Sequence, residues 1–306
     1  MRIGILATHK SEEQDRLYET AKAKGHTSTI LEVQKLSLGV FFDDPKVYHN
    51  EKDIHDDFDI IIPRIDIPYT DFGYRVLRQF QVAGTYVTDT AYSLELGRNK
   101  IRCLQYLSRK GIPFPKTAFS YTSEGYNNLL DVIDGESFII KLNEGTQGIG
   151  VFLAEDKKQA NNFLRTFDQI DVPVMLQEFI EESAGTDLRC FVVGGKVIAS
   201  MRRKAQDGDF RANISLGGHS EKSELTPEEE NMALKASEAI GLNIAGVDLI
   251  SSNRGPLVIE VNTAPDFMTG EWGLEKISGV DVAGAIIDFA ISGYKEFSQA
   301  EGGWLD

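Results

Sequence analysis

Two neighbouring apolar stretches in the last third of the chain carry polar groups that could bind a metal ion. In "LVIEVN" (257–262), Glu260 and Asn262 stand two residues apart, so on a β-strand their side chains point to the same face. Asp248 lies in "AGVDLI" (245–250), and the short turn between the two stretches predicts an antiparallel hairpin. If the register brings Asp248 to that face, two carboxylates and an amide converge, which is the type of oxygen ligand that Mg²⁺ takes. The alternative is a carboxylate that is satisfied by backbone donors or faces solvent.

A glycine-rich segment, "KLNEGTQGIGV" (141–151), could cover a phosphate group. Its three glycines, Gly145, Gly148 and Gly150, would let a ligand approach the backbone closely. The spacing matches neither a Walker A loop nor a dinucleotide fingerprint, and an ordinary hairpin tip is the alternative. Lys141 closes the apolar run "SFIIK", where its ammonium could reach phosphate as a point charge or simply extend into solvent.

Two further segments could contact a ligand. The basic stretch "RRKAQDGDFRANI" (202–214) stands in an otherwise acidic chain, and arginine forks suit carboxylate and phosphate oxygens, although a solvated charge run is the alternative. "QEFI" (177–180) ends an apolar run, where backbone groups could read the edge of an adenine ring; on its own it looks like any strand end. The five histidines form no metal-ligand spacing, and no catalytic triad is readable.

Composition narrows the class of protein. The chain has 306 residues and a net charge of −15, which argues against non-specific binding to a nucleic-acid backbone. Its two cysteines, Cys103 and Cys190, are far apart and fit a reduced compartment. No signal peptide and no apolar run of membrane-spanning length is visible. We therefore expect a cytoplasmic protein that binds neither membrane nor nucleic acid directly.

The elements that must position these residues fall into three units. Strand-like and helical patterns alternate over residues 1–97, which predicts a small α/β domain with a parallel sheet. A basic helix over 98–111 opens a second unit that extends to residue 180. Hairpin signals and a helix over 226–240, with Thr226 as its N-cap, mark a third unit over 181–292, in which 281–291 is also helical. Residues 293–306 read as a tail.

In this order and spacing, the motifs resemble the ATP-grasp superfamily, and most closely the RimK type, whose members add glutamate to the C-terminus of a ribosomal protein. The resemblance runs nearly end to end through these blocks: "IIPRI", "LRQF", "IKLNEGTQGIGV", "LQEFI", "DLRCFVVG", "RRKAQDGDFRANI", "AGVDLI" and "NRGPLVIEVN". It implies the ATP-grasp fold, of mixed α/β and α+β class, with an N-terminal pre-ATP-grasp domain and two α+β lobes that enclose ATP.

The resemblance also implies roles for individual residues. Lys100 and Lys141 would contact phosphates, Glu178 and Phe179 the adenine, and Asp187 the ribose. Arg211, Ala212 and Asn213 would lie along the phosphates, with Arg211 as the catalytic residue, and the loop Gly145, Thr146, Gln147, Gly148 would close over them. Asp248, Glu260 and Asn262 would hold two Mg²⁺ or Mn²⁺ ions. Arg64, Arg202, Arg203 and Asp266 are candidates for substrate contact.

The implied reaction joins a carboxylate to an amine. ATP phosphorylates the carboxylate, and the amine displaces phosphate from the resulting acylphosphate, a scheme that needs no protein nucleophile. The chain departs from the RimK pattern after "EVN", where Thr263-Ala264-Pro265-Asp266 replaces the usual segment ending in glycine. Two hypotheses follow: Asp266 binds the amino group of an acceptor, or the ligase acts on a different peptide or small molecule.

The partners that we expect are an amino acid and a carboxylate acceptor, such as the C-terminus of a protein or peptide, including a ribosomal protein. We also expect a homo-oligomer, either a dimer or a tetramer. An ATP-grasp kinase of a small-molecule hydroxyl and a catalytically silent nucleotide-binding module are the competing classes of function.

Overall fold

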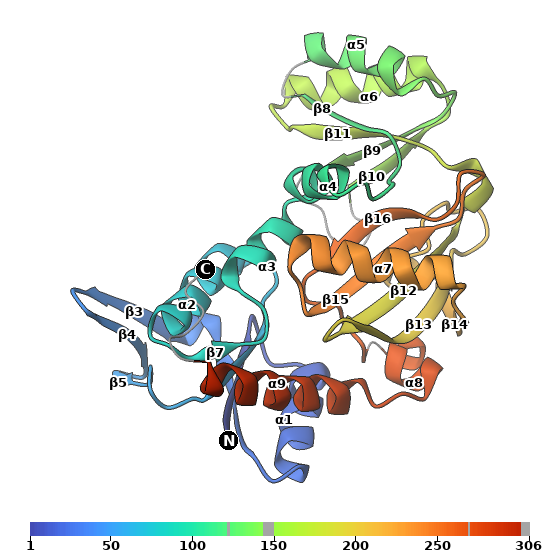
Figure 1. Ribbon diagram of the computed structural model, residues 1–306. Coiled ribbons are helices and arrows are strands. Elements are labelled where there is room, and N and C mark those ends of the chain that lie inside the picture. Colours follow the sequence, from blue (N-terminus) through green and yellow to red (C-terminus); the bar gives the residue numbers. More distant parts are fainter. Residues whose placement is uncertain (121–122, 143–149, 269, 301–306) are drawn as a thin grey trace.

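The computed structural model describes residues 1–120, 123–142, 150–268 and 270–300, which form three packed units (Figure 1). The first unit contains a parallel sheet of order β2-β1-β6-β7. Its elements are β1 (Arg2–Ala7), α1 (Glu12–Ala23), β2 (Thr27–Glu32), β6 (Ile60–Arg64), α2 (Thr70–Val82) and β7 (Tyr86–Val87). The central strand β6 is buried along its whole length, as its continuous apolar run predicts. The parallel sheet expected for this part of the chain is confirmed.

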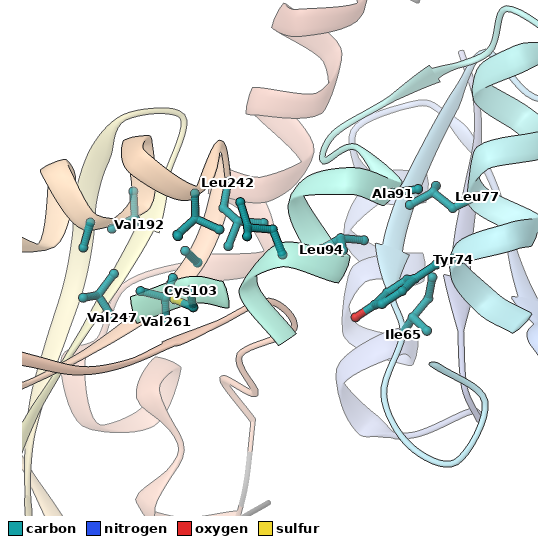
Figure 2. Close-up of a cluster of buried hydrophobic side chains, with 14 of the residues drawn as sticks. Ile65, Tyr74, Leu77, Ala91, Leu94, Cys103, Val192, Leu242, Val247 and Val261 are labelled. Atoms are coloured by element: carbon teal, nitrogen blue, oxygen red, sulfur yellow. The ribbon is translucent and has the colours of Figure 1, made fainter. Parts of the chain in front are cut away.

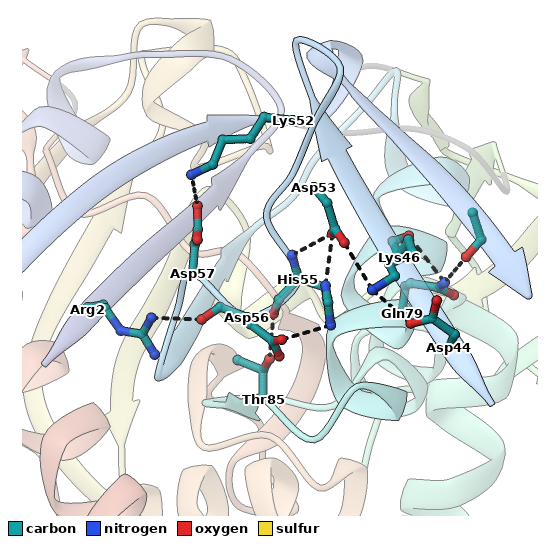
Figure 3. A network of polar contacts seen from close by, with 11 residues as sticks. Arg2, Asp44, Lys46, Lys52, Asp53, His55, Asp56, Asp57, Gln79 and Thr85 are labelled. Atoms are coloured by element: carbon teal, nitrogen blue, oxygen red, sulfur yellow. Dashed lines mark hydrogen bonds and ion pairs between the residues drawn. The ribbon is translucent and has the colours of Figure 1, made fainter.

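A second, smaller sheet in this unit was not predicted. A short 3₁₀ helix, η1 (Val33–Lys35), leads into β3 (Leu36–Phe41), β4 (Asp44–His49) and β5 (Lys52–Asp53), which pair in that order. Figure 1 shows β3 and β4 projecting from the body of the molecule. A polar network holds this hairpin along its length (Figure 3): Lys46 pairs with Asp44 and Asp53, and Gln79 Nε2 of α2 donates to the carbonyl oxygen of Gly39.

Two helices, rather than one, lead into the second unit. α3 (Ala91–Arg98) was not predicted, and the expected helix over 98–111 is shorter, as α4 (Lys100–Arg109). The helices meet at Asn99, which has extended backbone angles and accepts a hydrogen bond from Arg102 N at 3.0 Å, so it caps α4. This break places Lys100 at the first position of α4.

The second unit is an antiparallel sheet of order β10-β9-β11-β8 covered by two helices (Figure 1). The elements are β8 (Thr117–Ser120), α5 (Ser123–Ile133), β9 (Phe138–Leu142), β10 (Val151–Ala154), α6 (Lys157–Gln169) and β11 (Val174–Glu178). Its own core lies between sheet and helices, around Phe138, Ile140 and Leu176, which are fully buried. We call this unit the central lobe.

The third unit, the C-terminal lobe, contains a sheet of order β14-β13-β12-β15-β16. Its elements are η2 (Glu181–Ser183), β12 (Thr186–Val193), β13 (Lys196–Lys204), η3 (Ile214–Leu216), β14 (His219–Lys222), α7 (Pro227–Ile240), β15 (Ile244–Ile250), β16 (Leu257–Asn262), η4 (Gly270–Trp272), α8 (Leu274–Ser278) and α9 (Val282–Gln299). The predicted capping box of α7 is present, since Thr226 and Glu229 bond to each other's backbone N–H groups.

The last helix corrects the expected end of the third unit. α9 runs to Gln299, beyond the predicted helix over 281–291, so residues 293–299 are helical rather than part of a tail. It returns to the N-terminal unit, where Tyr294 and Phe297 pack against the ring of Tyr86 with centroids 6.4 and 5.5 Å away. Tertiary packing therefore extends this helix beyond the range that local pattern predicts.

One hydrophobic core joins the N-terminal unit to the C-terminal lobe (Figure 2). Figure 2 shows it running through α3, where Leu94 lies between the two sides. It continues to α4 and the C-terminal sheet through buried side chains that include Cys103, Val192, Leu242, Val247 and Val261. Among the described residues, no helix is long and apolar enough to span a membrane.

Candidate active site

The hairpin of β15 and β16 brings the predicted metal ligands together. Asp248 lies directly opposite Glu260 in the antiparallel register, and a register shift follows between Asp248 and Leu249. Asn262 is opposite Gly246, and its Nδ2 donates to Asp248 Oδ2 at 3.2 Å. Asp248 is buried, whereas Glu260 is exposed toward a cavity. The geometry therefore meets the condition that the sequence left open, and we call Asp248 and Glu260 the acidic pair.

Two arginines hold the buried member of the acidic pair. Arg189 donates to both oxygens of Asp248 at 2.7 Å each, and Arg203 Nη2 donates to Asp248 Oδ2 at 2.9 Å. Arg203 also binds both oxygens of Asp187, at 2.6 and 2.7 Å. Burial on its own would raise the pKa of Asp248, but the two guanidinium groups outweigh it and hold that pKa at about 2. The Asp248 carboxylate is thus an anion at any physiological pH.

These contacts change what the sequence suggested for the arginines. Arg203 was predicted to contact substrate, but its guanidinium is occupied by two carboxylates. Arg202 is next to Arg203 on β13, so its side chain faces the opposite side of the sheet and lines a different cavity. The structure therefore gives no support for a substrate role of Arg202 at this site. Arg189 was missed, although it lies two residues from Asp187 on β12 and therefore on the same face, a spacing that could have signalled it.

A cavity between the central and C-terminal lobes contains every predicted nucleotide residue that the structure describes. Its walls are largely apolar, with Leu104, Ile139, Met175 and Phe210 among them, which suits a flat heteroaromatic ring. It is lined by Lys100, Lys141, Glu178, Phe179, Asp187, Arg211, Ala212, Asn213, Asp248 and Glu260. The predicted phosphate-covering loop, Gly145 to Gly148, falls outside the described residues. Residues from distant parts of the chain thus meet at one ligand-sized space.

Cationic side chains stand beside the acidic pair in this cavity. Lys141 extends from β9, and burial lowers the pKa of its ammonium to about 8, although the carboxylates of Glu260 and Asp248 oppose that shift. Lys100 adds a second positive charge from the start of α4 and also lowers the pKa of Lys141. At pH 7 Lys141 is still mostly protonated, so it can act as a point charge toward phosphate oxygens.

The residues predicted for the adenine and for catalysis already have protein partners. Glu178 Oε1 accepts hydrogen bonds from Lys116 N at 2.7 Å and from Arg254 Nη2 at 2.5 Å. The ring of Phe179 makes an edge-to-face contact with Phe210 at 6.3 Å. Arg211 binds both oxygens of Asp209, at 3.0 and 2.8 Å, a pairing that orients its guanidinium. Their roles toward ATP stay predictions.

A second and a third cavity extend the site toward the N-terminal unit. The second shares Lys100, Glu260 and Asn213 with the first cavity and continues past Asn262 to Asp266. The third shares Asp66, Ala264 and Asp266 with the second and reaches the start of α1. The three spaces form a continuous series from the first cavity to the loop where the chain departs from the RimK pattern.

Arg64 connects that loop to the N-terminal unit. Its buried side chain donates from Nη2 to the carbonyl oxygen of Pro265 at 2.6 Å and forms an ion pair with Glu13. Its guanidinium carbon lies 6.0 Å from the ring centre of Phe267, which is itself fully buried. Within the described part of the chain, Nε and Nη1 of Arg64 have no hydrogen-bond partner. Glu13, the second residue of α1, was not among the predicted site residues.

The acidic pair and Asn262 fit a magnesium ion in their chemistry. They offer carboxylate and amide oxygens, which are the ligands of that ion, from one hairpin beside two lysines that could hold phosphate. One condition applies, because both Asp248 oxygens already accept hydrogen bonds from Arg189. A metal ion would have to share Asp248 with this arginine or displace it.

Comparison with known proteins assigns the family. A model of the RimK-like ATP-grasp domain matches residues 97–290, and a model of the RimK pre-ATP-grasp domain matches residues 1–94. The chain belongs to the RimK-like ATP-grasp family. The family prediction, the fold prediction and the prediction of an ATP-dependent carbon–nitrogen ligase are confirmed.

Individual relatives agree with this assignment. A probable alpha-L-glutamate ligase of Aliivibrio fischeri (strain MJ11) is 44% identical over 290 residues, 94% of this chain and 95% of that protein. The ATP-grasp ligase PsnB, solved with a minimal precursor, Mg and ADP, shares the fold with a TM-score of 0.73 at 19% identity, covering 95% of this chain and 97% of that one. A RimK domain ATP-grasp protein from Sphaerobacter thermophilus DSM 20745 gives a TM-score of 0.68 at 22% identity, covering 95% and 100%.

Proposed function

We propose that this RimK-like ligase uses ATP to join L-glutamate, through an amide bond, to a peptide or protein. The observation that carries the proposal is the acidic pair, which faces a cavity that also contains Lys100, Lys141 and Arg211. The description of the Aliivibrio fischeri relative as a probable alpha-L-glutamate ligase supports glutamate as the amino acid. The peptide acceptor rests on the family resemblance.

The reaction proceeds through an acylphosphate. A carboxylate oxygen of one substrate attacks the γ-phosphorus of ATP, and the bond to the β,γ-bridging oxygen breaks to release ADP. The amine of the second substrate then attacks the acyl carbon, and phosphate leaves as the amide forms and the amine loses a proton. Lys141, Lys100 and Arg211 offset the negative charge that gathers at the transferring phosphoryl group.

Asp248, Glu260 and Asn262 would hold the metal ions, either two Mg²⁺ or two Mn²⁺. When bound, such ions neutralise phosphate charge and orient the attacking and leaving oxygens. This scheme needs no protein nucleophile. Burial raises the pKa of Cys103, which lines the cavity, to about 12, and raises that of Cys190 as well, so both thiols are inert.

The amino-acid substrate would occupy the second and third cavities. Asp266 is exposed there and could bind an ammonium group, as the departure from the RimK pattern suggested. Within the described residues, Nε and Nη1 of Arg64 are buried and lack a hydrogen-bond partner, which suits a substrate carboxylate. Arg203 is better placed to hold Asp187 and Asp248 than to contact this substrate.

The experiment measures ADP formation and products by mass spectrometry with ATP, Mg²⁺, L-glutamate and a peptide with a free C-terminus. A mass increase of one glutamate residue on the peptide supports the proposal. Asp248→Asn is expected to abolish turnover, whereas the matched control Glu221→Gln, an exposed carboxylate of β14, keeps it. An unchanged rate in Asp248→Asn would refute the metal assignment. A phosphorylated product without an amide would show a kinase instead.

A further inference from the structure

The tip of the β3–β4 hairpin exposes three consecutive apolar side chains. Val40 is 81% exposed, Phe41 58% and Phe42 101%. Single exposed apolar residues are common, but a cluster of large ones at a projecting tip marks an interaction surface. We call these three residues the apolar tip.

The hairpin that presents the apolar tip is firmly held. Gln79 Nε2, from the buried side chain on α2, donates to the carbonyl oxygens of Gly39 at 2.8 Å and Lys46 at 3.3 Å, one on each strand. Lys46 bridges Asp44 and Asp53 at 2.7 and 3.1 Å (Figure 3). The exposure of the tip is therefore a feature of a fixed element and not of a fraying strand.

A groove of the same chain lies directly beside the apolar tip. It runs between β3, the turn at Ile67-Pro68, α2 and α3, and Leu38 and Val40 of β3 form one wall. Its apolar lining includes Ile67 and Tyr92, which are 52% and 50% exposed. We call this space the side groove. It offers apolar surface of the kind that would cover a phenylalanine ring.

The charges of the tip and of the side groove are complementary. Asp43, at the turn of the hairpin, is exposed and has no ionic partner in the described part of the chain. The side groove contains the guanidinium groups of Arg75, Arg78 and Arg98; Arg75 and Arg98 pair with acidic neighbours, and Arg78 has no such neighbour within the described ranges. In a chain of net charge −15, an unpaired arginine in a groove favours an acidic occupant.

We propose that the apolar tip of one copy of this protein occupies the side groove of a second copy, and the reverse, about a two-fold axis. Tip and groove share β3, so an axis beside this strand brings both tips into both grooves and closes the assembly. Phe42 then packs against the apolar wall while Asp43 meets Arg78. A partner of another kind would need to carry this apolar and acidic pattern, which the chain itself already has.

The contact reaches the active site of each copy. The side groove extends along Glu95, Arg98 and Asn99 to Lys100, which also lines the cavity between the central and C-terminal lobes. Occupation of the groove would therefore hold the junction of α3 and α4 in place. The proposal rests on the hairpin and the groove alone and not on which substrates the ligase accepts.

The test is sedimentation velocity of the full chain over a wide range of protein concentration. The wild type is expected to form a dimer of the 34.0 kDa chain, or a larger assembly of such dimers. Phe42→Ser should weaken association at least about tenfold, because truncating a central aromatic contact removes much of the binding energy. Val132→Ser is the matched control, since Val132 is 70% exposed on the central lobe, away from the groove.

Exchanging the two charges tests whether Asp43 of one copy pairs with Arg78 of the other, independently of the apolar contact. Asp43→Arg and Arg78→Asp should each weaken association, and the double variant should restore it. A monomeric wild type at all concentrations overturns the proposal, as does a Phe42→Ser variant that associates like the wild type. Failure of the charge exchange to restore association overturns the Asp43–Arg78 pairing. If an acceptor peptide, and not a second copy, protects the groove from hydrogen exchange, the occupant is the acceptor and the proposal is wrong.

Discussion

Replacing Arg203 by methionine tests the view that this residue holds two carboxylates in place, that of the buried Asp248 and that of the largely buried Asp187. Arg203 is 4% exposed and donates three hydrogen bonds, two to Asp187 and one to Asp248, at 2.6 to 2.9 Å. Methionine fills a similar volume but removes the charge and every donor. Asp248 keeps Arg189, whereas Asp187 loses both of its guanidinium contacts.

The expected cost follows from the uncompensated charge. Removing one partner of a buried ion pair costs about 3–5 kcal/mol, because the remaining charge stays in a poorly solvated position. Arg202→Met is the matched control: Arg202 is next to Arg203 on β13 but partly exposed on the other face, so its replacement should change stability by less than about 0.5 kcal/mol.

A double-mutant cycle makes the reasoning refutable. Asp187→Asn should destabilise the wild type, since it weakens a charged pair, but should stabilise the Arg203→Met variant, since it removes the orphaned charge. Because three packed units need not unfold together, stability is measured by hydrogen exchange of the amides of β12 and β13. Additive effects, or a loss below about 1 kcal/mol in Arg203→Met, would show that Arg203 does not act in this way.

Two further changes have definite outcomes. Burial raises the pKa of Glu13 from 4.5 to about 7, so the folded state keeps a proton that the unfolded chain has released, and stability should fall by up to about 3 kcal/mol as pH rises through that window. Hydrogen exchange of the α1 amides should show this fall in stability with pH in the control Glu12→Gln, at an exposed site, but not in Glu13→Gln. If the pH dependence persists in Glu13→Gln, another group causes it. A Cβ on Gly218 would lie 2.8–3.0 Å from three backbone oxygens, two of them in segment 212–213, so Gly218→Ala should raise the ATP dissociation constant at least about tenfold in calorimetry. An unchanged constant would remove 212–213 from the nucleotide site.

The features that were predicted correctly from the sequence are formed by residues close to one another in the chain. The capping box of α7 was readable because Thr226 and Glu229 lie three residues apart and satisfy each other's backbone. The acidic pair was readable because a short turn limits how β15 and β16 can pair, and because Glu260 and Asn262 must share a face. In both cases the short separation along the chain leaves few alternative ways for these residues to contact one another.

Features that depend on tertiary contact were not readable. From the sequence, Arg203 was predicted to contact substrate, because it lies in a basic stretch with no acidic residue directly beside it. Its partners, Asp187 and Asp248, lie on two other strands. The β3–β4 hairpin was missed because "SLGVFFDD" has no alternation of apolar and polar residues, and its apolar tip is exposed in the part of the chain that the structure describes. α9 was predicted too short because its last turns are stabilised by Tyr86, far away in sequence.

The segment "LVIEVNTAPD" shows how the two kinds of determinant meet at one site. Its first half is fixed mainly by the register of β15 and β16, and Val258 N also donates to the carbonyl oxygen of Pro113, outside the C-terminal lobe. Its second half is held from outside that lobe, since Arg64 of β6 binds the carbonyl oxygen of Pro265. The acidic pair and the loop that follows it therefore have different main supports. We expect a change in the N-terminal unit that moves Arg64 to shift the loop after Asn262 while leaving the register of β15 and β16 intact. On the proposed function, such a change would alter the choice of acceptor and not the phosphate chemistry.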